Sequence, residues 1–342
     1  MKLDATLMVD ARRLNEAGKI ARAAEAVGFA ALWTPETRHN PFLPLVLAAD
    51  HTAEIQLGTA VAIAFARSPM VTAQIAWDLQ AFSGGRFILG LGTQVKAHIE
   101  RRFGMTWDPP VPKLREYIQA LRAIWQAFQT GGKLDYRGQF YNHTLMSPFF
   151  NPGPIADPYI PIYIAGVNEG LARLAGELCD GFHVHPFHSV KYINEIVRPQ
   201  VAAGAAKAGR DPSQVSLTSS VFLITGPDEA SMESARAFAR EQIAFYASTP
   251  TYRVVLACHG WEDVGERLSR LAAARRWSEM GALITDEMLD VFAVTAPLDR
   301  IGKALRERYN GVLDRVGSYL PYTPGPLDDV WRQAVRDVSG GE

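Results

Sequence analysis

The sequence is poor in several features that mark particular classes of protein. Only two cysteines, Cys179 and Cys258, occur in 342 residues, which excludes a disulfide framework and is typical of a reducing compartment. A formal net charge of −1 gives no electrostatic basis for binding nucleic acid or a membrane surface. No apolar run approaches the roughly 20 residues of a membrane span, and the charged start MKLDATLMVDARR lacks a signal-peptide core. We therefore expect a soluble, cytoplasmic protein.

Three common catalytic motifs are also missing from the sequence: the G-x-S-x-G nucleophile elbow, the P-loop and a complete nicotinamide fingerprint. What the chain does have is apolar content, because 48% of its residues are hydrophobic. A chain of this length buries a large core without disulfides, and the length is normal for one α/β barrel with insertions.

The stretch EIQLGTAVAIAFARSPMVTAQIAWDLQAFSGGRFILGLGT, residues 54–93, shows the repeating unit of the fold. Residues 55–63 predict a strand, and Ser68-Pro69 opens a helix because proline is tolerated in a first helical turn. FILGLG is a nearly all-apolar strand that needs cover on both faces. One face of the helix is expected to be apolar, since hydrophobic residues recur at helical spacing: Val71, Ile75, Leu79 and Phe82.

This pattern of strand followed by helix recurs eight times, which favours a closed (β/α)8 barrel, a TIM barrel, over an open sheet. We expect one domain covering 1–342. Residues 228–290 are almost wholly helical in pattern and too long for one crossover, so they predict a helical subdomain inserted before the last strand. The expected strands are 2–8, 29–34, 55–63, 87–92, 161–165, 180–185, 215–225 and 312–320.

The phrases LGTAV, ARSPMVTAQ and DLQAFSGGRFILGLGT resemble the signature of the bacterial luciferase-like superfamily, and the resemblance extends over most of the chain. That superfamily holds flavin-dependent monooxygenases and reductases, and enzymes that use the deazaflavin coenzyme F420. The resemblance implies hydride transfer between coenzyme F420 and a small organic substrate. One alternative is a monooxygenase that uses reduced FMN from a separate flavin reductase. A flavin-binding protein without turnover is the other alternative in this fold.

The resemblance also implies roles for particular residues. In the F420 branch an acidic residue at the place of Glu36 contacts the deazaflavin. Glu36 and His39 are the two candidate catalytic residues, either of which could supply a proton, and His39 is also a candidate substrate contact. The family carries a non-prolyl cis peptide at the place of Ala60-Val61, where the backbone presses on the middle of the ring. Related enzymes hold the ring edge and the ribityl chain with the loop that follows the fourth strand, here Thr93, Gln94, Val95 and Lys96.

Val95 is a departure from one branch of the family. Sugar-phosphate dehydrogenases have a catalytic glutamate at this place, which argues against carrying over their substrate or proton donor. The basic residues nearby suit either a phosphate or polyglutamate tail, or a solvated helix start: Lys96, His98, Arg101 and Arg102.

The turn from Ala165 through Gly166 and Val167 to Asn168 predicts a phosphate site. A strand ends there, glycine permits close approach of the backbone, and the N-terminus of a helix presents free N–H groups. The family places its cofactor phosphate near this loop. A tight turn with Asn168 as helix cap is the alternative.

Four residues are candidates for substrate binding: Arg38, His98, Trp107 and His185. His185 belongs to an H-x-H-x-x-H pattern with His183 and His188, which makes a metal-dependent hydrolase the rival chemistry. Such a site also needs carboxylates from other strand ends, so we expect no metal. The family commonly forms dimers through helices beside the second and third strands, and a homodimer is expected.

Overall fold

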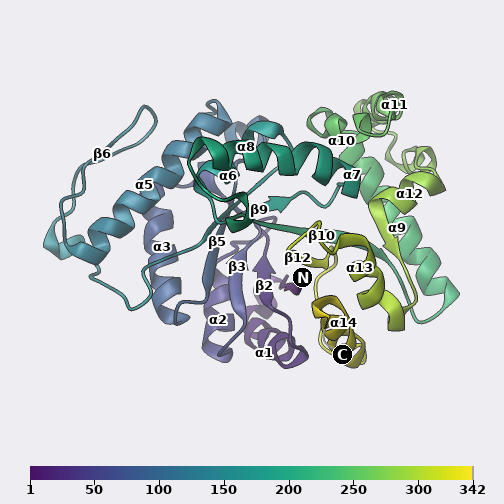
Figure 1. Ribbon diagram of the computed structural model, residues 1–342, viewed down its shortest axis with the longest axis horizontal. Helices are drawn as coiled ribbons and strands as arrows, with labels where there is room; N and C mark the ends of the chain where they lie inside the picture. The colour runs from purple at the N-terminus through teal and green to yellow at the C-terminus, as the bar shows by residue number, and fades with distance from the viewer. Residues whose placement is uncertain (341–342) are drawn as a thin grey trace.

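The computed structural model describes residues 1–340 and shows a closed barrel of eight parallel strands (Figure 1). Strand β12 pairs with β1, and β10 pairs with β9, so the ring has no open edge. The order around the ring is β1-β2-β3-β5-β8-β9-β10-β12, as the sequence predicts. The strands span Lys2–Thr6, Ala31–Thr34, Gln56–Thr59, Phe87–Gly92, Ile162–Gly166, Gly181–Val184, Ser216–Ile224 and Arg315–Ser318.

Helices surround this barrel, and their ends follow from local sequence. Gly28 ends α1 in the left-handed conformation, with φ of 98°. The Ser68 hydroxyl accepts from the Val71 N–H at 3.3 Å and starts α3. The helices outside the insertion are α1 (Ala17–Val27), α2 (Leu43–His51), α3 (Pro69–Phe82), α4 (Lys96–Arg101), α5 (Pro110–Thr130), α6 (Glu169–Leu178), α7 (Val190–Tyr192), α8 (Arg198–Lys207), α13 (Ile301–Tyr309) and α14 (Asp328–Ser339).

The buried face of α3 differs from the expected one. Val71 is 46% exposed and Phe82 is 55% exposed, although both belong to the predicted apolar face. The helix instead buries Ala73, Ala76 and Trp77, because the alanines allow close approach of α5, whose Trp125 indole donates to the Ala73 carbonyl at 3.1 Å. Leu79 of the predicted face is buried as expected. Apolar residues lie on more than one side of α3, so periodicity alone identified only part of the buried face.

The helical insertion is confirmed and stands at one side of the barrel (Figure 1). It contains α9 (Glu229–Ala247), α10 (Arg253–Ala257), α11 (Glu262–Ala273) and α12 (Asp286–Phe292). The sequence analysis missed β11 (Ala293–Thr295), which pairs in parallel with Phe222–Ile224 of β10. Three residues are too few to show a strand period.

Two smaller features complete the fold. A hairpin follows α5, formed by β6 (Tyr136–Arg137) and β7 (Asn142–His143), on the opposite side of the molecule from α9 (Figure 1). Within residues 1–340, no helix combines the length and apolar character that crossing a membrane requires.

The interior of the barrel contains a buried ion pair. Asp4 and Arg315 are 3% and 4% exposed, and two guanidinium nitrogens donate to the Asp4 carboxylate at 2.7 and 2.9 Å. The Trp33 indole donates to the same carboxylate at 2.9 Å, and Gln56 accepts from Arg315 at 2.8 Å. These bonds satisfy both charges, which a buried pair requires.

Candidate active site

The site is built at the carboxyl ends of the barrel strands, the end where barrels of this kind carry their chemistry. The predicted strand at 55–63 is divided into β3 and β4 (Ala62–Ile63) by a cis peptide between Ala60 and Val61, as expected. A Cβ on Gly92, the last residue of β5, would lie 2.5 Å from Val61 Cγ2. Glycine at 92 therefore lets the main chain of β5 pack directly against the Val61 side chain.

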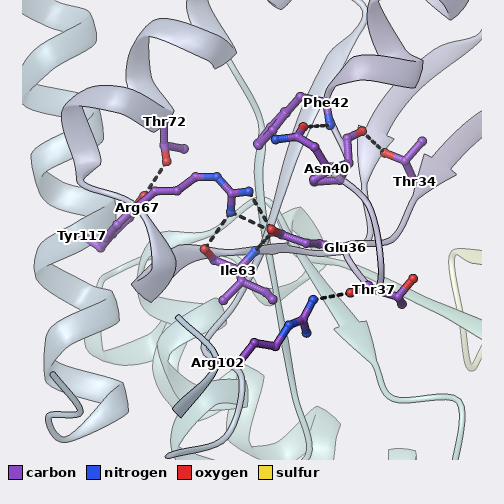
Figure 2. Close-up of polar contacts among 11 residues, drawn as sticks. Thr34, Glu36, Thr37, Asn40, Phe42, Ile63, Arg67, Thr72, Arg102 and Tyr117 are labelled. Atoms are coloured by element: carbon purple, nitrogen blue, oxygen red, sulfur yellow. Dashed lines mark hydrogen bonds and ion pairs between the residues drawn. The ribbon is translucent and has the colours of Figure 1, made fainter. Parts of the chain in front are cut away.

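Glu36 lies in the loop after β2, and its side chain points toward Ile63 and Arg67, on the segment that follows this break (Figure 2). Its main-chain N–H donates to the Val61 carbonyl at 3.2 Å, and one carboxylate oxygen accepts the Ile63 N–H at 2.7 Å. The guanidinium of Arg67 donates to both carboxylate oxygens, at 2.7 and 2.6 Å. The carboxylate is thus held as a fixed acceptor, and the loop after β2 is joined to the segment that follows the cis peptide.

Arg67 is a residue that the sequence analysis missed. The side chains of Arg67 and Glu36 are 14% and 7% exposed, so each charge needs the other. The need for a counter-charge is the signal that could have identified Arg67, because a buried glutamate at a strand end requires one. Its main role here is to neutralise and orient Glu36.

The other residues of the loop after β2 are more accessible. Arg38 and His39 are exposed, and neither has a hydrogen-bonding partner among residues 1–340. The preceding Thr37 accepts through its carbonyl from the Arg102 guanidinium, which joins this loop to the basic segment after β5 (Figure 2). His39 therefore remains a candidate for chemistry that needs access to solvent.

Trp107 lies beyond the basic segment and is half-buried. Its ring packs edge-on against Phe65, with ring centroids 6.0 Å apart. Phe65 follows β4 closely, and the Lys113 ammonium lies 5.0 Å from the centre of its ring. The structure therefore places Trp107 next to the segment that begins with the cis peptide.

The loop after β5 has an unusual backbone. Gln94 adopts φ of 59°, and its side-chain oxygen accepts the Val95 N–H at 2.9 Å. Non-glycine residues in this region cost on the order of 1–3 kcal/mol and cluster at ligand sites. Thr93 and Gln94 are half-buried, whereas Val95, Lys96 and His98 are exposed.

The turn after β8 leads from a strand end into the N-terminus of α6, as the sequence predicts. Gly166 ends the strand and Asn168 precedes α6, but the Asn168 side chain makes no capping bond to the helix. The first N–H groups of α6 have no acceptor within the helix. The carboxylate of Glu169, in the first turn of α6, accepts a hydrogen bond from the side-chain amide of Gln200 at 3.0 Å. Main-chain donors are therefore available at this strand end, beside Ala165 and Val167.

The three predicted histidines lie in different surroundings. His183 projects into the barrel, with its ring 4.9 Å from Trp33, and burial lowers its pKa to about 3. His188 is buried, and its Nε2 lies 3.2 Å from the Tyr309 hydroxyl. His185 follows β9 and is partly exposed. Within residues 1–340, no group of three or more His, Cys, Asp or Glu side chains has an arrangement suited to a metal ion.

An aromatic cluster surrounds His185 and was also missed. Tyr246 of α9 and Tyr252 of the following turn lie 4.6 and 4.5 Å from the imidazole, measured between ring centroids. The hydroxyls of Tyr246 and Tyr319, the residue after β12, are 2.7 Å apart. Tyr246 and Tyr252 are close in sequence to each other but far from His185 and from Tyr319, so no local pattern joins them to the histidine.

Comparison with known proteins identifies related chains. The profile of the family described as luciferase-like monooxygenase matches residues 2–315. An uncharacterized protein of Mycobacterium tuberculosis, Rv1360, is 48% identical over 340 residues, covering 96% of this chain and 99% of that protein. The 5,10-methylenetetrahydromethanopterin reductase of Methanolobus tindarius is 31% identical, covering 86% and 85% of the two chains.

A solved structure supports the fold independently. The coenzyme F420 dependent tetrahydromethanopterin reductase from Methanopyrus kandleri superposes with a TM-score of 0.77, covering 99% of this chain and 98% of that one. The sequence identity is 20%, so this likeness shows the shared barrel.

Proposed function

This chain belongs to the luciferase-like monooxygenase family of oxidoreductases, and we propose that it is a coenzyme F420-dependent member that transfers a hydride to or from a small organic substrate. The observation that carries the proposal is the position of Glu36. Its carboxylate is fixed at the carboxyl end of β2, beside the small residue Ala60, where the F420 branch has an acidic residue in contact with the deazaflavin.

The residues present fit such a cofactor. Ala60 and Val61 are half-buried and have small or short side chains, so the main chain is open to a flat ring. The free N–H groups at the start of α6, after Gly166, Val167 and Asn168, suit a phosphate group. When bound, the deazaflavin supplies a ring carbon that gives or accepts the hydride.

The chain's own contribution would be to bind, orient and shield. Thr93, Gln94, Val95 and Lys96 would flank the ring and its side chain, and Trp107 would cover one approach to it. Arg38, His98 and His185 would contact the substrate. Glu36, held by Arg67, would orient the ring, while His39 is the better placed of the two predicted catalytic residues to exchange a proton with solvent.

Binding of oxidised coenzyme F420 and of FMN, measured side by side by calorimetry, tests the proposal. Tight binding of coenzyme F420 with weak binding of FMN is the expected result. Strong FMN binding together with oxygen consumption would instead indicate a monooxygenase supplied by a flavin reductase. Binding without any multiple-turnover reaction would indicate a flavin-binding protein.

We also propose that a second copy of this chain covers α2 and α3. These helices expose large apolar side chains, and a groove of about 430 Å³ lies between α3 and residues 149–152. Exposed apolar side chains are a mark of protein–protein interaction sites when they form a patch. The exposed side chains are Leu43, Val46, Val71, Phe82, Phe149 and Phe150.

A further inference from the structure

His185 is held in one tautomer by the main chain. The Phe187 N–H donates to His185 Nδ1 at 3.1 Å, so this nitrogen is the acceptor and carries no proton. A neutral imidazole must then carry its proton on Nε2. Among residues 1–340, no hydrogen bond to His185 Nε2 is present, and the side chain is partly exposed. The imidazole therefore offers one N–H donor to a molecule outside the chain.

The surroundings of this donor are aromatic and uncharged. Tyr252 stacks on the imidazole with an interplanar angle of 30°, and Tyr246 meets it edge-on at 80°. Burial raises the pKa of both phenols, and burial together with His188 lowers the pKa of His185 to about 3. All three rings are therefore neutral near pH 7.

The aromatic cluster around His185 lies across the barrel from the proposed cofactor position. In the ring order, β3 with Ala60 and Val61 stands four strands from β10 in either direction. His185 follows β9, Tyr319 follows β12, and Phe222 of β10 packs against Tyr319 with centroids 4.6 Å apart. A molecule bound between β3 and this cluster would contact the cluster with the side that points away from β3.

We propose that this cluster recognises an uncharged, planar carbonyl compound or the corresponding alcohol, whose oxygen accepts the His185 Nε2–H while its apolar part packs on Tyr246 and Tyr252. This inference rests on the proposed function only in one respect, namely that the cofactor lies beside β3 and the substrate lies between it and the cluster. A carboxylate or phosphate at the same place would be desolvated against neutral rings, at a considerable cost in free energy. The chemistry thus separates this site from one for sugar phosphates.

The tautomer is tested first, in the full-length protein labelled with ¹⁵N-histidine. Long-range proton–nitrogen correlation spectra identify the protonated nitrogen, and the His185→Gln spectrum assigns the signal. We expect His185 to carry its proton on Nε2 near pH 7. A proton on Nδ1, or a doubly protonated ring, overturns the inference.

Substrate class is tested with three probes of similar size: acetophenone, α-methylstyrene and benzoate. Acetophenone has a carbonyl oxygen where α-methylstyrene has a methylene group, so this pair tests the hydrogen bond. Benzoate carries a negative charge, so it tests whether the site accepts an anion. We expect the wild-type protein to bind acetophenone at least about tenfold more tightly than benzoate. His185→Phe should weaken acetophenone binding about five- to tenfold and leave α-methylstyrene binding unchanged.

His143→Phe is the matched control, since His143 lies in the β6–β7 hairpin on the other side of the molecule (Figure 1). It should bind all three probes as the wild-type protein does. His185→Gln, which keeps an N–H donor, should restore part of the acetophenone affinity and serves if His185→Phe does not fold. Equal binding of acetophenone and benzoate, or no binding of either at millimolar concentration, contradicts the inference. These probes need no cofactor, so failure to bind coenzyme F420 would overturn only the proposed function.

Discussion

The guanidinium of Arg67 contacts both carboxylate oxygens of Glu36, at 2.6 and 2.7 Å, while the Ile63 N–H donates to one of the same oxygens. Three segments of chain therefore meet at one carboxylate: the loop after β2, strand β4 and the turn before α3. These contacts fix the orientation of the main chain around Ala60 and Val61. The proposed function places the cofactor ring against this main chain.

Arg67→Met should destabilise the protein by about 3–5 kcal/mol, because it leaves the buried Glu36 carboxylate without its counter-charge. Urea unfolding monitored by circular dichroism measures the change. The double variant Glu36→Gln with Arg67→Met should recover much of that loss, since it leaves no unpaired charge. Arg13→Met, which breaks the exposed pair with Glu16, is the control and should leave stability unchanged. Equal effects of Arg67→Met and Arg13→Met would contradict the assigned role.

Gly90→Ala should be far more damaging than an ordinary glycine substitution. A Cβ at Gly90 would lie 1.7 Å from the Thr59 carbonyl oxygen, so β3 and β5 would have to separate. Overpacking of this kind costs about 1–3 kcal/mol or more. Gly281→Ala is the matched control, because a Cβ there meets no atom within 4 Å and the φ is not left-handed. Thermal unfolding of the two variants gives the comparison, and similar melting temperatures would contradict the close strand contact.

Acid should destabilise the fold through His183. Its pKa is lowered to about 3, so the folded chain binds fewer protons than the unfolded chain below the ordinary value of 6.5. Stability from this group is complete above that value and falls as the pH drops below it. Between about pH 7.5 and about pH 5, the loss from His183 should be about 2 kcal/mol. In urea unfolding, the free energy of unfolding of His183→Leu should fall by about 2 kcal/mol less than that of the wild-type protein over this pH range. The same pH dependence in both proteins would exclude a buried neutral histidine at 183.

Phe82→Lys should shift the protein toward monomer, because it places a charge in the apolar surface of α2 and α3. Light scattering coupled to size-exclusion chromatography measures the mass. Met8→Lys changes a comparably exposed apolar side chain outside these helices and should leave the mass unchanged. A monomeric wild-type protein, or equal behaviour of both variants, would contradict the proposed interface.

Strand and helix alternation was enough to predict the barrel, because eight buried apolar strands allow few other arrangements. Local chemistry also predicted several ends, such as Gly28 after α1 and Ser68 before α3. The buried side of α3 was not predictable in the same way. It depends on which neighbour packs closely enough to use Ala73 and Ala76, and that choice is made in three dimensions.

The positions of Glu36, Thr93 and Gly166 at the ends of their strands were predictable from the sequence, whereas their roles in binding stay a prediction. The roles of Arg67 and of the tyrosines around His185 were not predictable, since they arise from partners distant in the chain, as between Tyr246 and Tyr319, which are 73 residues apart. A search for a basic partner of each carboxylate that is expected to be buried would have identified Arg67. The aromatic cluster offers no comparable rule, because its members come from three separate elements.

Strand β11 has a consequence for how this protein diversifies. The chain leaves β10 at Ile224, builds the whole insertion, and returns at Ala293 directly beside Phe222. The two attachment points therefore lie on adjacent, paired strands, and the eight-strand ring closes through β12 regardless of what lies between them. Exchange of this one segment between related barrels would replace Tyr246 and Tyr252 together and leave Glu36 and Arg67 in place. Under the proposed function, recombination at these two points would change the proposed substrate contacts while the proposed cofactor contacts stay the same.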